Sequence, residues 1–132
     1  MSLSFHLDFN GQCEEAFAFY ATELGGRISF MLRGRDAPGT TPAWQQDKVV
    51  HASLLIDGVQ LSGADVEPQR YEKPAGFHVL LGVASEQRVD AAFEALQAHG
   101  TVILPPQRTF WSPRYAIVVD RFGVPWKINC GT

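Results

Sequence analysis

Three histidines and one lysine are the strongest candidates for chemistry in this 132-residue chain. His6, His51 and His78 each fall in a segment with the residue pattern of a β-strand. A neutral imidazole accepts a proton or binds zinc, so these residues are candidates for general-base catalysis or metal binding. Lys127 adds a cation that could hold an anion or stabilise developing negative charge. Each histidine could equally be a hydrogen-bonded strand residue, and both interpretations stay open.

Two tryptophans and an arginine are further candidates, because they fall in loops. Trp111 and Arg114 follow a Pro-Pro pair and precede a strand. The indole would form an apolar wall of a pocket and the guanidinium would pair with an anion. Alternatively, Trp111 packs in the core and Arg114 caps a carbonyl. Trp44 lies in a long loop rich in Pro, Gly and Thr, where it would close over a pocket or serve a dimer contact.

The first half of the chain predicts one helix among four strands. Apolar and polar residues alternate from Ser4 to Phe9, which is typical of a half-buried strand. Apolar residues then recur at helical spacing from Cys13 to Leu24, and Gly25-Gly26 ends that helix. Asp57-Gly58 is a hairpin turn. We therefore expect strands at 4–9, 27–32, 49–56 and 59–62, and a linker at 65–76.

The second half repeats this order. Ser85 is the expected N-cap of a helix that ends at Gly100. Pro105-Pro106 is expected to end the strand that follows. Phe5-His6-Leu7 recurs as Phe77-His78-Val79, and each copy leads into the same series of elements. The remaining strands are expected at 77–83, 101–104, 115–119 and 125–129.

The repetition predicts an α+β fold of two βαβββ modules, module one at 1–66 and module two at 75–132. One module alone closes too little apolar surface to be stable, so we expect both to form a single domain. Two curved mixed sheets would then surround a concave pocket suited to a small molecule.

Composition excludes several classes of function. Lys and Arg number 11 and Asp and Glu number 14, a net charge of −3, so neither nucleic acid nor a membrane is an expected partner. The longest apolar stretch, 79–84, is far shorter than the ~20 residues of a membrane span. The N-terminus lacks the pattern of a signal peptide. We expect a cytoplasmic protein with two free thiols, Cys13 in the apolar stripe of the first helix and Cys130.

Three segments resemble a known family: LDFNGQCEEAFAFYATELGG near the start, VVHASLLIDGVQLSGAD in the middle, and TFWSPRYAIVVDRFGVPWKINC at the end. With these the chain looks like the vicinal oxygen chelate superfamily, also called the glyoxalase/bleomycin-resistance/dioxygenase superfamily, and within it the PhnB-like branch. The resemblance implies the same fold, a small-molecule ligand and a homodimer, and whether the dimer is module-swapped stays open.

The resemblance also implies four metal-ligand positions, usually His and Glu, on the first and last strands of each module. Carried onto this sequence, these positions fall at Ser4, at Gln60 or Ser62, at His78 and at Lys127. An ammonium has no lone pair for a metal. We therefore expect no metal at the usual site and no cofactor. His6, His51 and His78 would be an alternative zinc site if all three faced the pocket.

The expected function is binding of a small, anionic organic ligand. The alternative is an enzyme of the lyase, isomerase or dioxygenase type with an atypical or metal-free site. His51 or His78 would then be the general base, and Lys127 or Arg114 would stabilise an oxyanion. A third possibility is an interaction module whose cavity is filled by side chains. The candidate ligand-binding residues are His6, Asp8, Trp44, His51, Ser53, Gln60, His78, Trp111, Arg114 and Lys127.

Overall fold

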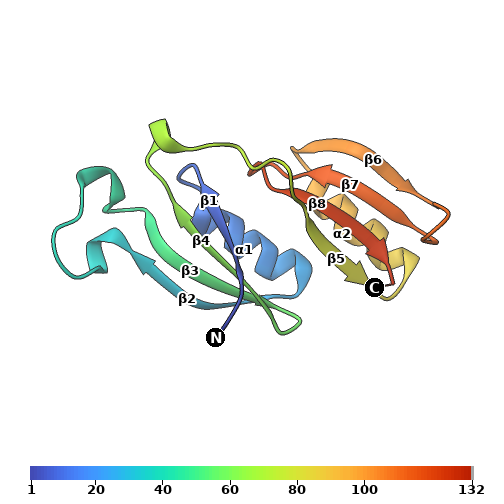
Figure 1. Cartoon of the computed structure of the whole chain (residues 1–132), viewed down its shortest axis with the longest axis horizontal. Helices are drawn as coiled ribbons and strands as arrows, with labels where there is room; N and C mark the ends of the chain where they lie inside the picture. Colours follow the sequence, from blue (N-terminus) through green and yellow to red (C-terminus); the bar gives the residue numbers. More distant parts are fainter. Residues whose placement is uncertain (132) are drawn as a thin grey trace. The chain divides into compact units, whose positions relative to one another are not determined.

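Each half of the chain folds into a four-stranded mixed sheet with one helix packed on it (Figure 1). The computed structural model describes residues 1–131, and the chain divides into a first unit, Met1–Glu72, and a second unit that begins at Lys73. The elements of each unit follow the order βαβββ. The α+β fold class expected from the sequence repeat is confirmed.

The first sheet has the strand order β1-β4-β3-β2. The outer strand β1 runs parallel to β4, whereas the other neighbouring strands are antiparallel. Three short 3-10 turns lie in the connections, η1 (Gly34–Asp36), η2 (Ala43–Gln45) and η3 (Pro68–Arg70). The unit comprises β1 (Phe5–Phe9), α1 (Cys13–Leu24), β2 (Arg27–Arg33), β3 (Val49–Ile56) and β4 (Val59–Asp65).

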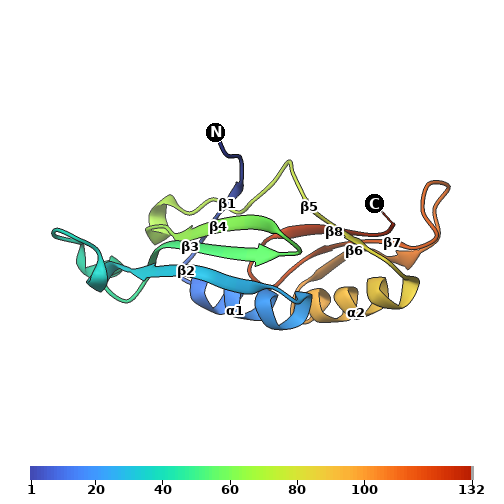
Figure 2. The same ribbon diagram turned by 90° about the horizontal axis from the view of Figure 1, so that it is seen from below.

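One face of the first sheet packs against α1 (Figure 2). The apolar stripe of α1, including Cys13 and Phe17, is fully buried, as its helical spacing predicts. Close packing requires a glycine in β4, because a Cβ on Gly63 would lie 2.8 Å from a ring carbon of Phe17. The opposite face carries polar residues, and we call it the polar face of the first sheet. It presents His6, Asp8, His51, Ser53, Gln60 and Ser62.

The second sheet has the equivalent order β5-β8-β7-β6. Ser85 is the N-cap of α2, as expected, because its Oγ accepts a hydrogen bond from the amide of Arg88 at 3.2 Å. Trp126 is buried against α2, and its Nε1 donates to Asp120 Oδ2 at 2.9 Å. The unit comprises β5 (Val79–Val83), α2 (Glu86–Gln97), β6 (Thr101–Gln107), β7 (Tyr115–Val119) and β8 (Pro125–Cys130).

The structure corrects several sequence-based boundaries. The strand expected at 77–83 begins at Val79, so His78 lies just before β5 and not in it. The Pro105-Pro106 pair does not end its strand, and β6 continues to Gln107. β6 is an edge strand with an irregular register to β7, and an edge tolerates residues that lack an amide proton. Asp65 is not the start of a linker but the last residue of β4. Its buried carboxylate accepts hydrogen bonds from the amides of Cys13 and Val49, each at 2.9 Å.

None of the helices within residues 1–131 combines the length and the apolar character that a membrane crossing needs.

Candidate functional site

The polar face of the first sheet brings together two of the three predicted histidines. His6 and Asp8 alternate along β1 with buried Leu7, so both side chains point away from α1. His6 Nε2 lies 3.2 Å from Asp8 Oδ1, and the two side chains are 48% and 55% exposed. The His51 ring stacks on the His6 ring, with centroids 6.5 Å apart and an interplanar angle of 14°. A carboxylate and two imidazoles therefore form one cluster.

Hydroxyl and amide groups border this cluster. Ser53 of β3 pairs in register with Ser62 of β4, which in turn pairs with His6 of β1. Both serines are buried, and Gln60 Nε2 donates to Ser62 Oγ at 3.3 Å. The predicted residues Ser53 and Gln60 thus share a face with His6 and His51. The polar face of the first sheet can therefore donate and accept hydrogen bonds across its strands β1, β4 and β3.

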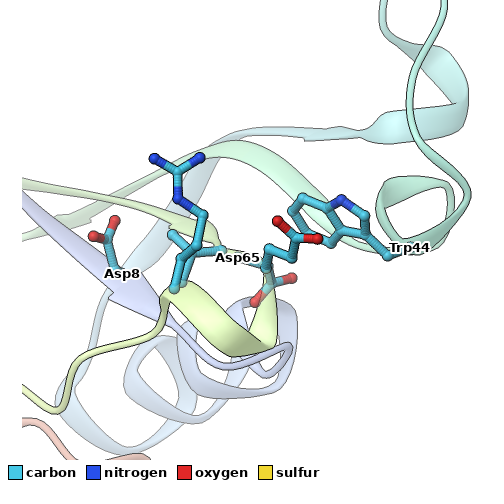
Figure 3. Close-up of a pocket in the computed structure, with 6 residues that line it drawn as sticks. Asp8, Trp44 and Asp65 are labelled. Atoms are coloured by element: carbon cyan, nitrogen blue, oxygen red, sulfur yellow. The ribbon is translucent and has the colours of Figure 1, made fainter.

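A pocket of about 410 Å³ opens beside the polar face, within the first unit. Asp8 and Trp44 lie on opposite sides of it (Figure 3). η2 carries Trp44 into the pocket wall, so this predicted residue lines the same pocket as Asp8. The remaining lining residues are Asp65, Val66, Glu67 and Arg70.

Sequence reasoning missed Glu67, Arg70 and Phe30. The first two lie in the segment that was interpreted as a linker, where Glu67 precedes η3 and Arg70 ends it. The Glu-Pro pair that opens η3 could have signalled an ordered turn, since proline favours the first position of a helical turn. Phe30 contacts the His51 ring at a centroid distance of 5.8 Å. Strand alternation alone could not have placed it, because a register shift in β2 between Ile28 and Phe30 decides which face Phe30 occupies.

In the second unit, the positive charge of Lys127 acts on His78. Lys127 lies between buried Trp126 and Ile128 in β8, so its side chain is on the face away from α2. The pKa of His78 is lowered from its ordinary value of 6.5, first by burial and then by the positive charge of Lys127. No carboxylate of residues 1–131 lies within ion-pair distance of Lys127.

The two remaining predicted residues take different positions. Trp111 is 56% exposed, so it does not pack in the core. Its ring makes edge contacts with Phe110 and Tyr115, at centroid distances of 4.7 and 5.2 Å. Arg114 is held within its own unit, because its Nε donates to Asp90 Oδ1 of α2 at 2.6 Å. Arg114 therefore bonds a carboxylate rather than a backbone carbonyl.

The residues at the four implied metal positions do not fit a divalent cation. The first position supplies a serine hydroxyl, and the second supplies either a glutamine amide or a serine hydroxyl. The third supplies an imidazole and the fourth an ammonium. The lowered pKa of His78 shows that Lys127 already disfavours a second positive charge there. Among residues 1–131, no three His, Cys, Asp or Glu side chains gather in positions that could hold a metal ion.

Known proteins and a family model match this chain over nearly its whole length. Protein YjdN of Escherichia coli (strain K12) is 30% identical over 139 residues, which cover 98% of this chain and 95% of that protein. The crystal structure of protein PA1353 from Pseudomonas aeruginosa is 36% identical, with a TM-score of 0.91 over 99% of this chain and 98% of that one. A PhnB protein from Bacillus cereus shares the fold, with 23% identity and a TM-score of 0.82 over 99% and 100% of the two chains. The model of the Glyoxalase/Bleomycin resistance protein/Dioxygenase superfamily matches residues 6–128, and the chain belongs to that superfamily.

Proposed function

We propose that this protein binds a small organic anion through Lys127 of β8 and His78, which lies just before β5, without a metal ion at the position usual for its superfamily. The observation that carries the proposal is the environment of Lys127. The side chain is half-buried, and no carboxylate of the described chain neutralises it. Among the described residues of its own unit this ammonium has no counter-charge, and a ligand carboxylate or phosphonate would supply one.

The surroundings of Lys127 suit an organic acid rather than an inorganic ion. In register, Lys127 is flanked by Leu80 of β5 and Ile117 of β7, which offer apolar contact to a carbon chain. The lowered pKa of His78 favours its neutral form, in which one ring nitrogen can donate a hydrogen bond to the anion. Asn129, two residues further along β8, has a buried Oδ1 with no hydrogen-bond partner in residues 1–131. A hydroxyl or N–H group of the ligand would satisfy this oxygen.

Isothermal titration calorimetry tests the proposal with matched probes: butanoate, methylphosphonate and neutral butanamide. Butanoate and methylphosphonate are expected to bind at least about tenfold more tightly than butanamide, because a charge-assisted hydrogen bond is stronger than a neutral one. Lys127→Met should abolish this preference and Lys127→Arg should keep most of it. Lys48→Met is the control, since Lys48 donates to the Gly11 carbonyl in the first unit. Equal or tighter binding of butanamide, or no effect of Lys127→Met, would contradict the proposal.

The second candidate function is metal-independent catalysis. The observation that favours it is the pairing of His6 with Asp8 beside the stacked ring of His51. A carboxylate that orients an imidazole is a common arrangement of a general base and its positioning residue. Turnover would appear as deuterium uptake from D2O into C–H bonds of the ligands that bind, followed by NMR. Under this alternative, the parent chain exchanges and His6→Ala or His51→Ala abolishes the exchange, whereas under the binding proposal neither the parent chain nor the variants exchange.

Assembly as a homodimer and a cytoplasmic location stay predictions of the sequence. Sedimentation velocity of the purified full chain tests the first, and a single species at the mass of one chain would contradict it.

A further inference from the structure

We propose that the pocket of the first unit binds a small organic zwitterion, with its ammonium group held by Trp44 and Glu67 and its acidic group held by Arg70. All of the residues that line this pocket belong to the first unit, and the inference does not rest on the function proposed above. Its volume of about 410 Å³ falls within the ~300–1,000 Å³ that is usual for small-molecule sites. Its wall contains an aromatic ring and charges of both signs.

The ammonium end is favoured by the excess of negative charge in the wall. Three carboxylates, of Asp8, Asp65 and Glu67, line the pocket with a single guanidinium. Asp65 uses both oxygens to accept backbone amides, so it contributes a fixed charge rather than a free acceptor. One carboxylate oxygen of Glu67 accepts a hydrogen bond from Gln69 Nε2 at 2.6 Å. The carboxylate has a second oxygen that can accept a hydrogen bond from the ligand. An ammonium near Glu67 would also gain from the negative face of the Trp44 indole.

A metal ion is the less suitable cation for this wall. The carboxylates do not gather into a group that could coordinate an ion, since no such group of three exists among residues 1–131. Charges spread around a pocket suit an organic cation whose bulk spans the space, with the aromatic ring supplying contact area.

The acidic group of the proposed ligand is inferred from the position of Arg70. Its side chain is exposed at the end of η3 and lines the pocket. Among residues 1–131, no carboxylate lies within ion-pair distance of this guanidinium, and this includes the three carboxylates that line the pocket. The planar guanidinium is therefore available to take a carboxylate or phosphonate in the two-point manner that arginine favours. A simple amine would leave it unpaired, so a zwitterion matches the wall better.

Three probes with the same carbon chain separate these contributions: 4-aminobutanoate, butylamine and butanoate. Binding is followed through the indole N–H signal of Trp44 in the NMR spectrum, assigned with Trp44→Phe, because this indole is part of the pocket wall. 4-Aminobutanoate is expected to shift this signal with an affinity at least about tenfold above either singly charged probe. Glu67→Gln should weaken 4-aminobutanoate and butylamine about fivefold to tenfold but not butanoate, and Arg70→Gln should weaken 4-aminobutanoate and butanoate but not butylamine.

The matched controls remove the same charges outside the pocket, in Glu72→Gln and Arg108→Gln, and should change none of the affinities. Lys127→Met should also leave the Trp44 response unchanged, which separates this site from the function proposed above. Failure of all three probes to shift the Trp44 signal, equal affinities for the zwitterion and butanoate, or equal losses in Glu67→Gln and Glu72→Gln would each overturn the inference.

Discussion

Asp120 and Trp126 are joined by a buried hydrogen bond of 2.9 Å from the indole Nε1 to the carboxylate Oδ2. The other carboxylate oxygen of Asp120 accepts the amides of Phe122 and Val124, at 2.9 and 3.0 Å. One side chain thus closes the turn between β7 and β8 and fixes the largest core residue of the second unit. The register of β8, and with it the position of Lys127, depends on this connection.

Replacing Asp120 with alanine should lower the free energy of unfolding by about 3 kcal/mol, because three buried donors lose a charged acceptor. Asp120→Asn should cost less, since the amide oxygen can still accept. Urea denaturation followed by circular dichroism measures both. Asp47→Ala is the matched control, because Asp47 forms an ion pair with Arg35 while 75% of its side chain stays exposed. It should change stability by no more than about 0.5 kcal/mol. Similar losses in both variants would show that Asp120 does not have this structural role.

Much of the fold was predictable from the spacing of apolar residues, because a helix or strand that is buried on one face has apolar residues at the period of that element. Cys13 to Leu24 shows this for α1, whose predicted limits match the structure. The Pro105-Pro106 pair misled because edge position, which makes proline tolerable, depends on the order of strands in the sheet. That order is a tertiary property and leaves no local signal.

The candidate site was predictable only in part for the same reason. Alternation placed His6 and Asp8 on one face of a strand, and the structure agrees. The stacking of His6 on His51 depends on β4 lying between β1 and β3, which no short pattern reveals. Arg70 was missed because a charged segment with prolines has the same composition whether it crosses open surface or lines a pocket.

The pH titration of His78 should report on Lys127. Burial and the charge of Lys127 lower the pKa of His78 below 6.5, and Lys127→Met removes the second cause. The variant should therefore titrate at a higher pH than the parent chain while still falling below 6.5. Bound butanoate should shift the titration in the same direction, because it neutralises Lys127. NMR of the imidazole signals measures this, with Lys48→Met as a control that leaves His78 unchanged. A downward shift in Lys127→Met would refute the coupling.

The same pKa has a consequence for stability. As the pH falls below 6.5, the unfolded chain takes up a proton at His78 before the folded chain does. The contribution of this residue to stability is therefore present above pH 6.5 and declines as the pH falls toward the folded pKa. His78→Gln should flatten this part of the pH profile in urea denaturation. A profile of unchanged slope would mean that the folded and unfolded chains bind this proton equally.

Gly34 should prove essential for the position of Trp44. A Cβ on Gly34 would lie 2.1 Å from the carbonyl oxygen of Gln45, the neighbour of Trp44 in η2, so Gly34→Ala must displace that turn. We expect a loss of about 1–3 kcal/mol in the free energy of unfolding and a weaker Trp44 response to 4-aminobutanoate. Gly39→Ala is the control in the same loop, because a Cβ there meets nothing within 4 Å although its φ of +85° is unfavourable for alanine. It should cost about 1 kcal/mol and leave the Trp44 response intact. An unchanged Trp44 response in Gly34→Ala would show that η2 adapts without moving the indole.

The two cysteines should differ sharply in reactivity. Burial raises the pKa of the Cys13 thiol, and the negative charges of Asp65 and Glu14 raise it further. Because the thiolate is the reactive form, Cys13 should resist a disulfide reagent such as DTNB in the folded chain. Cys130 is only partly buried, so the native protein should release one equivalent of thionitrobenzoate and the denatured protein two, one for each cysteine of the sequence. Cys130→Ser should remove the native reaction, whereas Cys13→Ala should preserve it. Rapid labelling of Cys13 in native Cys130→Ser would mean that α1 opens readily, and that the hydrogen bond from its first amide to Asp65 does not hold the helix in place.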